Sequence, residues 1–395
     1  MDGHLTAEIS ASAVRANLTL LRGLVAPGAK LCAVVKSDFY GLGADALLGA
    51  VAQLADCLAV ATAEEAVELR SKGYGGPVLL LLPAGADANT LDELLARQVT
   101  VTVVAPEELS PLVRAAQRRR ARAEVHVKID TGMHRGGADP AGVAELVGQV
   151  RSQAGLRLAG LYTHLANADE RDLSFAREQL ARFRQAVASC GARDGLVLHA
   201  ANSAAAIQMP EAHLDMIRPG IAVYGYQPGD WMQQLLPLKP ALRLWSRLVQ
   251  VKHVPAGASC GYGLTHTFSR DSRIGRVPVG YADGYFRCLS NKASMRIGGC
   301  DVPVVGRVSM DQTILDLTAA PRANIGDVVE IISDDPAAPH SVERLARLAG
   351  TIPHELITRL GRRVRRVASE GVYLPETAAS PEPAGRQSGA EPAAR

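Results

Sequence analysis

The sequence has no apolar run that approaches the roughly 20 residues needed to cross a membrane. Its first residues, MDGHLTAEISAS, lack the basic start, the apolar stretch and the cleavage pattern of a secretory signal. The net charge is only +3 over 395 residues, which favours neither a nucleic acid nor an anionic membrane as partner. We therefore expect a cytoplasmic protein that works on small molecules.

Cysteines and basic residues are present, but not in the patterns that bind metals or nucleic acids. The six cysteines form no C-x-x-C pair and have no histidine at metal-ligand spacing, which predicts reduced thiols and no metal site. Two basic runs, 114–124 and 359–367, are short and lack interleaved aromatic residues. Solvated surfaces explain such runs better than binding to DNA or RNA.

Between residues 31 and 225, eight short apolar runs alternate with stretches that carry helix signals. The runs that we interpret as strands are LCAVVK, CLAVA, VLLLL, VTVTVV, VHVKI, RLAGLYTH, LVLHA and IAVYG. Continuous apolar strands separated by helices predict a parallel sheet covered on both faces. Eight such units in succession favour a closed (β/α)8 barrel over an open doubly wound sheet.

Helix boundaries are marked within this repeat. Thr62 with Glu65 and Thr90 with Glu93 are spaced as capping boxes, and Lys72-Gly73 is typical of a helix end. After about Leu235 the pattern becomes β-rich, with Gly and Pro turns. We predict a barrel domain over 1–235 and a mostly β domain over 236–370, with a helix from Ser341 to Ala349. Residues 371–395 have too few large apolar side chains to form a core and are expected to be disordered.

Polar residues gather where the predicted strands end, which is the side of a (β/α)8 barrel that carries active sites. Taken singly, each has an ordinary structural explanation; Lys36, for example, can snorkel to water. Their convergence on one rim favours a function. The candidates are Lys36, Lys128, Asp130, Arg135, His164, Asn202 and Ser203, together with Arg218 just before the eighth run.

An anion site is also predicted on this rim. Ser203 opens a short Ala-rich helix, and the Gly220-Ile221 backbone can add donors to a phosphate. A lysine opposite a phosphate seat fits a Schiff base to pyridoxal phosphate, and it fits a Schiff-base aldolase as well.

The order of seven motifs separates these alternatives. The chain contains VVKxxxYGxG, KIDTGMxR, HxANS, RPGIAVYG, GYG, VPVGYADGY and VGRVSMDQ, and from about Leu5 to Val367 it resembles the alanine racemase family. The resemblance implies a barrel followed by a β domain, which agrees with the pattern above. It also implies interconversion of L- and D-alanine for cell-wall peptidoglycan, with pyridoxal 5′-phosphate as cofactor.

The resemblance implies two catalytic groups. Lys36 holds the cofactor and moves a proton on one face of the substrate, and Tyr262, from the partner subunit of a homodimer, acts on the other. Racemisation needs proton transfer on both faces, so this pair is chemically sensible. A chain from Tyr262 through His164 to Arg218 would lower the pKa of the tyrosine. Arg218 would face the ring nitrogen without readily protonating it.

Further residues receive roles from the same resemblance. Those placed around the phosphate are Tyr40, Ser203, Gly220, Ile221 and Tyr224, with Asn202 beside the ring. Arg135 and the Met310 backbone would bind the substrate carboxylate, and Tyr281 and Asp311 would lie near the entrance. Lys128 aligns with a lysine that is carbamylated in many members. Without the resemblance, Tyr281 and Met310 would pass for ordinary strand and core residues.

The chain departs from the family pattern beside the lysine and near the C-terminus. Ser37-Asp38 replaces Ala-Asn, Leu42 replaces a histidine, His354-Glu355 replaces Tyr-Glu, and Arg362 stands where some members have a tyrosine. These changes leave open a racemase of broader or serine-preferring specificity. A non-catalytic pyridoxal-phosphate carrier is an alternative that would lack the second domain and Tyr262. A decarboxylase of the same barrel class is expected to have an acidic residue in place of Arg218.

Overall fold

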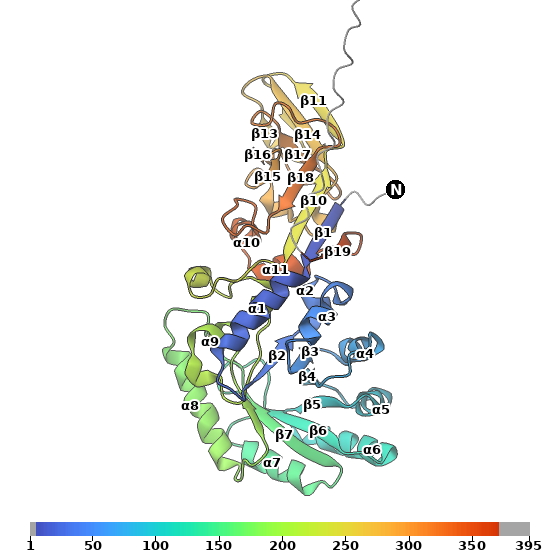
Figure 1. Cartoon of the computed structure of the whole chain (residues 1–395), viewed down its shortest axis with the longest axis vertical. Coiled ribbons are helices and arrows are strands. Elements are labelled where there is room, and N and C mark those ends of the chain that lie inside the picture. Colours follow the sequence, from blue (N-terminus) through green and yellow to red (C-terminus); the bar gives the residue numbers. More distant parts are fainter. Residues whose placement is uncertain (1–4, 371–395) are drawn as a thin grey trace, which may run out of the picture.

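The computed structural model describes residues 5–370, and a barrel and a smaller β-rich unit follow one another along its long axis (Figure 1). The predicted disordered tail, 371–395, lies outside the described residues. The α-helices are α1 Ala11–Leu24, α2 Lys36–Tyr40, α3 Ala44–Ala52, α4 Ala63–Ser71, α5 Ala88–Ala96, α6 Leu109–Arg119, α7 Val143–Ser152, α8 Ser174–Ser189, α9 Ser203–Gln208, α10 Val342–Ala349 and α11 Pro353–Thr358. The 3-10 turns are η1 Pro106–Glu108, η2 Pro210–Ala212, η3 Ile221–Tyr224, η4 Asp230–Gln234, η5 Tyr262–Leu264, η6 Tyr281–Asp283 and η7 Arg287–Leu289.

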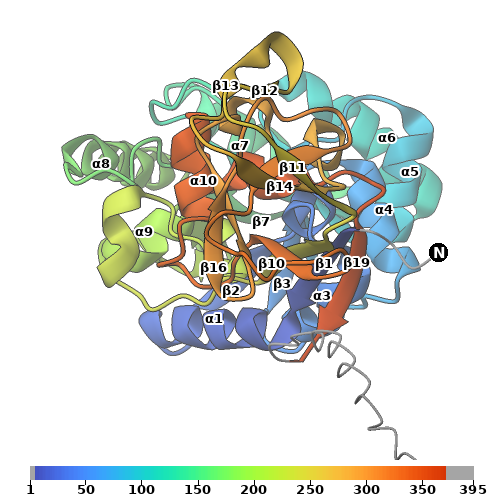
Figure 2. The ribbon, with the colours of Figure 1, turned by 90° about the horizontal axis from the view of Figure 1, so that it is seen from above.

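The barrel consists of eight parallel strands in the order β8-β7-β6-β5-β4-β3-β2-β9, which confirms the predicted fold class. Its strands are β2 Lys30–Val34, β3 Cys57–Val60, β4 Val78–Pro83, β5 Val99–Val103, β6 Ala123–Lys128, β7 Leu156–Tyr162, β8 Val197–His199 and β9 Met216–Ile217. The ring closes between β8 and β9, where the Arg218 N–H donates to the Ala201 carbonyl at 2.8 Å. Helix α1 contacts both α3 and α9 and completes the outer ring (Figure 2).

The eighth strand is not the predicted run IAVYG. The pair β9 Met216–Ile217 takes that place in the ring, and Ile221–Tyr224 forms the 3-10 turn η3 instead. All four residues of this turn are buried. A short buried apolar run has the same periodicity in a strand as in a helical turn, so the sequence pattern could not distinguish them. Arg218 therefore follows the eighth strand rather than preceding it.

The second unit is built on a six-stranded sheet in the order β16-β15-β18-β10-β1-β19, beside sheets β11-β14-β17 and β12-β13. Its strands are β1 Leu5–Ser10, β10 Leu242–Arg247, β11 Gln250–Val254, β12 Ser259–Cys260, β13 His266–Thr267, β14 Ser272–Val277, β15 Ser294–Ile297, β16 Cys300–Pro303, β17 Thr313–Asp316, β18 Val328–Ile332 and β19 Arg365–Ser369. Strand β1 pairs antiparallel with β10 and parallel with β19. The N-terminal strand thus joins the sheet of the second unit, a pairing that local patterns do not encode.

Most of the predicted helix boundaries are confirmed. Thr62 and Glu65 form the capping box of α4, and α10 runs from Val342 to Ala349 between its N-cap Ser341 and its C-cap Gly350. The box predicted at Thr90 is wrong, because Asp87 caps α5 and its carboxylate accepts the Thr90 N–H at 2.8 Å. Aspartate is a strong N-cap, and here it lies one turn earlier than the predicted box.

Two findings concern residues 5–370 as a whole. No helix in this range is long and apolar enough to span a bilayer. All six cysteines lie in the range and are free of disulfides.

A buried ionic cluster joins strands of the large sheet. Arg243 Nε donates to Glu330 Oε1 at 2.7 Å, and His340 Nε2 lies 3.0 Å from Glu330 Oε2. Glu8, from the N-terminal strand, lies 3.8 Å from the Arg243 guanidinium. Burial by itself would raise the pKa of Glu330, but the bonds from His340 and Arg243 outweigh it and lower this pKa to about 2.

We expect Glu330→Gln to destabilise the fold at pH 7 by about 3 kcal/mol, because it removes the buried carboxylate charge that bonds both Arg243 and His340. The unfolded carboxyl has a pKa of about 4.3, and the folded one is lower. Its stabilisation is therefore present above about pH 4.3 and is lost as pH falls towards 2. Urea unfolding at pH 7 and pH 3 should show a smaller acid effect in the variant. Glu93→Gln, which breaks an exposed pair with Arg97, should cost less than about 0.5 kcal/mol.

Candidate active site

The structure brings the rim candidates together at the C-terminal ends of five strands. Lys36 follows β2, Lys128 ends β6, His164 follows β7, Asn202 and Ser203 follow β8, and Arg218 follows β9. Asp130 and Arg135 lie in the loop after β6. Asp130 shapes this loop by accepting the Gly132 N–H at 3.0 Å and the His134 N–H at 3.1 Å.

Lys36 does not end its strand as predicted, since β2 stops at Val34. The next four residues after Lys36 are all left-handed, with φ of 54° at Ser37, 50° at Asp38, 55° at Phe39 and 57° at Tyr40. Each costs roughly 1–2 kcal/mol for a residue other than glycine. Such strain persists only where the surroundings hold it, so the backbone beside Lys36 is fixed by tertiary contacts. We call residues 37–40 the left-handed turn.

Cations crowd around Lys36. Burial lowers the pKa of Lys36, and the nearby Arg135 lowers it further, while Glu65 acts in the opposite direction. Burial, Arg135 and Arg218 likewise lower the pKa of Lys128, although Asp130 opposes them. A cluster of positive groups with few carboxylates attracts an anion, and it raises the fraction of molecules in which a lysine of the cluster is neutral. The rim is therefore suited to an anionic ligand and to amine chemistry.

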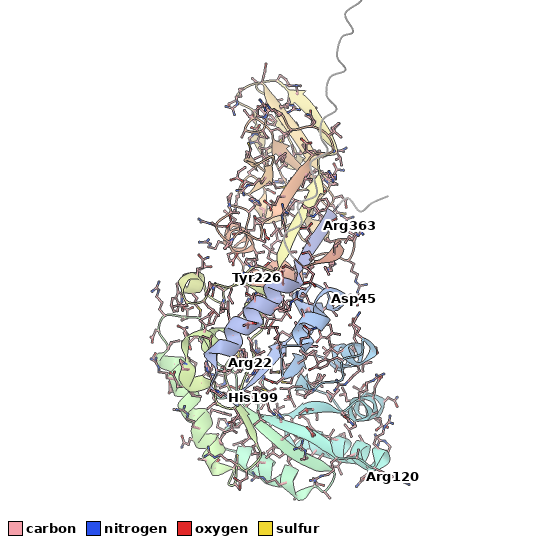
Figure 3. The ribbon with its side chains drawn as sticks, in the orientation of Figure 1. Arg22, Asp45, Arg120, His199, Tyr226 and Arg363 are labelled. Carbon is pink, nitrogen blue, oxygen red and sulfur yellow. The ribbon has the colours of Figure 1, made fainter. Side chains whose placement is uncertain are left out.

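Arg218 is buried and begins a chain of rings that the sequence pattern did not reveal. Its Nη1 donates to His199 Nδ1 at 2.8 Å, and the other nitrogen of His199 lies 2.8 Å from His126 Nδ1. Burial, followed by the charge of Arg218, lowers the pKa of both histidines, that of His126 to about 3. Neutral His199 thus accepts from Arg218 and donates to His126. Figure 3 labels His199 within the barrel.

The other bonds of Arg218 go to neutral groups. Its Nη2 donates to the Thr163 carbonyl at 2.8 Å and, more weakly, to His164 Nδ1 at 3.4 Å. Within residues 5–370 the structure gives Arg218 no bond to a carboxylate. The guanidinium therefore stays a positive donor at the rim, and His164 keeps its proton on the other nitrogen.

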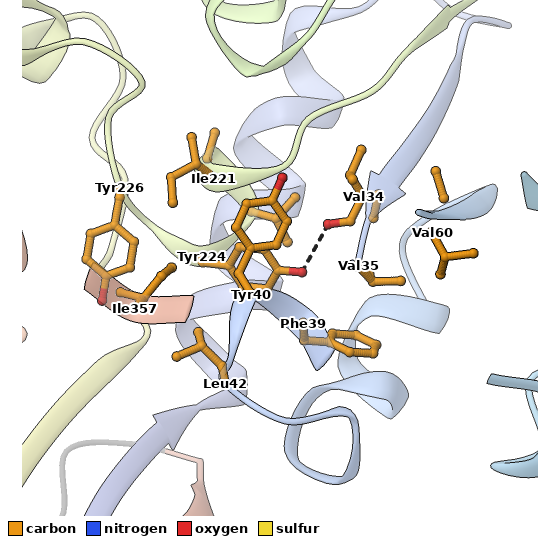
Figure 4. Packing of buried hydrophobic residues seen from close by; sticks show 14 of the residues in the cluster. Val34, Val35, Phe39, Tyr40, Leu42, Val60, Ile221, Tyr224, Tyr226 and Ile357 are labelled. Carbon is orange, nitrogen blue, oxygen red and sulfur yellow. Dashed lines mark hydrogen bonds between the residues drawn. The ribbon is translucent and has the colours of Figure 1, made fainter. Parts of the chain in front are cut away.

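Ser203, Gly220 and Tyr40 lie close together on the rim, where the sequence predicts an anion site, and we call this cluster the seat. The Ser203 hydroxyl accepts the Gly220 N–H at 2.8 Å and the Ala222 N–H at 3.3 Å. A Cβ at Gly220 would lie 2.2 Å from the Tyr40 hydroxyl, so only glycine fits there. Tyr224 packs behind Tyr40 with ring centroids 4.9 Å apart, and its hydroxyl donates to the Val34 carbonyl (Figure 4). Tyr224 thus buttresses Tyr40.

His354, a departure from the family pattern, lies beside Tyr40 of this seat. Its ring lies 6.1 Å from that of Tyr40, and its Nδ1 is buried without a hydrogen-bond partner. Burial, followed by the charge of Lys36, lowers the pKa of His354 to about 4. A buried ring nitrogen without a partner, near Lys36 and Tyr40, fits a polar anionic ligand such as the phosphate of pyridoxal phosphate.

The other departures have structural tasks. Asp38 accepts the Ala44 N–H at 2.7 Å, where helix α3 begins. Leu42 is fully buried in the core cluster that also contains Ile357 and Tyr226 (Figure 4). Ser37 is exposed, and its backbone N–H donates to Glu65 at 2.6 Å. Asp38 and Leu42 therefore stabilise the chain around the left-handed turn.

The second-unit candidates lie apart from the rim. Tyr262, Tyr281 and Met310 are exposed to 72%, 43% and 53%. The Tyr281 N–H donates to the Ser309 carbonyl. Arg363, labelled in Figure 3, bonds Asp283 and Asp311 at 2.5 Å each and so joins the loop that carries Tyr281 to the loop that carries Met310. Within residues 5–370 no hydrogen bond or ion pair links these residues to the rim. Arg363 carries no sequence motif and was not predicted.

Two family profiles cover most of the chain. Residues 9–228 match the description "Alanine racemase, N-terminal domain", and residues 241–368 match "Alanine racemase, C-terminal domain". The two matches correspond to the barrel and to the β-rich unit.

Full-length relatives agree with these profiles. The chain is 38% identical over 373 residues to an alanine racemase of Desulfovibrio desulfuricans, covering 93% of this chain and 99% of the relative. It is 39% identical over 384 residues to one of Desulfosudis oleivorans, covering 94% and 98%. The crystal structure of alanine racemase from Streptomyces lavendulae matches with a TM-score of 0.88 at 37% identity, over 94% of this chain and 98% of that one. The biosynthetic alanine racemase of Pseudomonas aeruginosa gives 0.84 at 35% identity, over 93% and 100%.

Proposed function

Since this chain belongs to the alanine racemase family, we propose that it interconverts L- and D-alanine with two bases, Lys36 and Tyr262 of a second subunit. The observation that carries the proposal is the position of Lys36, among cations and beside the seat formed by Ser203, Gly220 and Tyr40. An amino-acid racemase needs an amine that is neutral part of the time and a site for an anionic ligand, and this rim provides both.

Pyridoxal 5′-phosphate, when bound, draws electrons from Cα and so makes the α-proton of the amino acid acidic enough to be removed. Lys36 would hold it through its amine, and Ser203, Gly220, Ile221 and Tyr40 would hold the phosphate. Arg218 would face the ring nitrogen, with Asn202 beside the ring. Asn202 is held in place because its Oδ1 caps α9 through the Ala205 N–H at 3.0 Å.

Lys36 serves as one base because its lowered pKa keeps a larger neutral fraction than an ordinary lysine has. Arg135, exposed at the mouth, would bind the substrate carboxylate and fix the face that Lys36 meets. Lys128 also has a lowered pKa. A neutral amine is the form that reacts with carbon dioxide, and the lowered pKa is therefore compatible with a carbamylated Lys128. The carbamylation itself stays a prediction.

Tyr262 would be the second base and would come from the partner of a homodimer. In one chain it is 72% exposed, and Figure 1 draws its neighbour β13 with β10 and β1 between it and the barrel. The second unit exposes the large apolar side chains Tyr262, Leu264, Tyr281 and Met310, which suits a contact with a second copy. His164, whose Nδ1 accepts from Arg218, would link Tyr262 to Arg218.

Arg218 and the second domain distinguish the racemase from most of the alternative functions. Arg218 stands where a decarboxylase of this barrel class would have an acid, and the second domain exceeds what a carrier protein or an aldolase needs. A racemase of broader or serine-preferring specificity shares every feature above, so it stays the second candidate. Action in the cytoplasm and supply of D-alanine to peptidoglycan also remain predictions.

The test is exchange of the α-proton in heavy water. Purified protein with pyridoxal phosphate should exchange the α-proton of both L- and D-alanine, and exchange of neither would reject the racemase proposal. A screen of alanine, serine, lysine and arginine should then rank alanine first. We expect kcat/KM for serine to be about 10- to 100-fold lower, since an apolar pocket rejects an added hydroxyl only modestly. A higher kcat/KM for serine would favour the second candidate.

A further inference from the structure

Glu65 touches the left-handed turn beside Lys36. One of its carboxylate oxygens, Oε1, accepts the Ser37 N–H at 2.6 Å. The other oxygen accepts the Ala61 N–H at 2.8 Å and the Thr62 N–H at 3.2 Å. Glu65 lies in the first turn of α4, directly after β3. A single carboxylate therefore ties the start of the turn to the loop of the neighbouring barrel strand.

Glu65 thus does more than complete the capping box with Thr62. A capping box needs only the bonds between Glu65 and Thr62, and the bond to Ser37 is additional. Ser37 is the first residue of the left-handed turn and directly follows Lys36. Because this conformation is unfavourable for residues other than glycine, the contacts that hold its first residue also set the direction of Lys36.

Other contacts hold the far end of the same turn. A Cβ at Gly41, whose φ is +82°, would lie 2.5 Å from the Ile357 carbonyl of α11. Arg366 Nε donates to the Gly41 carbonyl at 2.8 Å. The C-terminal elements thus fix where the turn ends, and Glu65 fixes where it starts. Only the Glu65 end adjoins Lys36.

The charge of Glu65 also acts on Lys36. Burial and Arg135 lower the pKa of Lys36, and Glu65 opposes them. The other charged or titratable groups that interact with Lys36 are Lys128 of β6, His164 after β7 and His354 of α11. None of these is acidic, so the loss of the Glu65 charge should shift Lys36 further towards the neutral amine.

We propose that Glu65, by accepting the Ser37 N–H, is a positioning residue for Lys36 and holds the left-handed turn that directs its amine into the site. The inference rests on the proposed function, because it assumes that Lys36 binds the cofactor. An amide cannot replace this carboxylate. Its single oxygen can accept on one side only, and its NH2 would face N–H donors on the other.

The experiment compares four variants of the full chain. Cofactor-free protein is titrated with pyridoxal phosphate over a pH series, and the absorbance band of lysine-bound cofactor gives a pH midpoint. The second readout is kcat, measured separately from KM. Glu65→Gln should still form the band, with a midpoint at lower pH than in the wild type, and kcat should fall about 10- to 100-fold from a misplaced amine. Glu65→Asp, which keeps the charge but is shorter, should leave the midpoint unchanged and still lower kcat.

Two controls separate positioning from helix capping. Glu64→Gln alters the exposed neighbour on the same turn and should match the wild type in both readouts. Thr62→Val removes the other half of the capping box and should lower stability without moving the midpoint. The proposal is overturned if Glu65→Gln behaves like either control, or if Glu65→Asp retains full kcat. Absence of the band in the wild type would instead reject the proposed function.

Discussion

Lys36→Ala is expected to abolish both the absorbance band of lysine-bound cofactor and racemisation, with kcat reduced by about 10³-fold or more. The variant removes the amine that holds the cofactor, and it removes a base worth roughly 10²–10⁴-fold by itself. The measurement is an absorbance spectrum after addition of pyridoxal phosphate, followed by α-proton exchange of both alanine isomers.

Lys252→Ala provides the control for this variant, because Lys252 is an exposed lysine on β11 of the second unit. It should keep the band and the wild-type rate. An unchanged spectrum in Lys36→Ala would show that another group binds the cofactor, with Lys128 as the nearest candidate on the rim. The proposed function would then need a different first base.

Tyr262→Phe is expected to keep the cofactor band but to lose racemisation in both directions, by about 10²–10⁴-fold. Removal of one hydroxyl leaves Lys36 and the phosphate seat intact, so one alanine isomer should still exchange its α-proton through Lys36. Racemisation at the full rate would show that Tyr262 is not a base. Tyr74→Phe, remote from the rim between α4 and β4, should retain the wild-type rate.

Mixing the two inactive variants tests whether the site is shared between subunits. In a random mixture half of the dimers are mixed, and each mixed dimer has one site with both Lys36 and Tyr262. The mixture should therefore regain about a quarter of the wild-type activity, as expected for a two-fold symmetric pair. Activity that stays at the level of the separate variants would indicate that each site is built from one chain.

Local patterns were sufficient for the architecture of the barrel. Continuous apolar runs such as VLLLL can be buried on both faces only in a covered parallel sheet, and eight in succession predict the ring. The capping box of Thr62 with Glu65 and the helix after Ser341 were also predicted, since each helix signal lies within one turn. The prediction that IAVYG is a strand was wrong, because a buried helical turn can have the same apolar composition as a buried strand.

The tertiary structure decided what depends on residues distant in sequence. Strand β1 joins a sheet whose other members begin after residue 240, and no local signal specifies such a register. His126 lies on β6, His199 ends β8 and Arg218 follows β9, and the lowered pKa values of these residues arise first from burial. The contacts of Arg363 with Asp283 and Asp311 likewise join residues whose spacing in the sequence does not predict a contact.

Strand order and apolar periodicity are local properties of the chain, so they were enough to predict the barrel, the motifs and the rim on which Lys36 stands. The position and the protonation of Lys36 depend instead on contacts that form in the folded protein. Four left-handed residues, the carboxylate of Glu65 and the packing of α11 against Gly41 set its position, and burial with Arg135 sets its pKa. These effects depend on distance and solvent exclusion between segments that meet only in the fold.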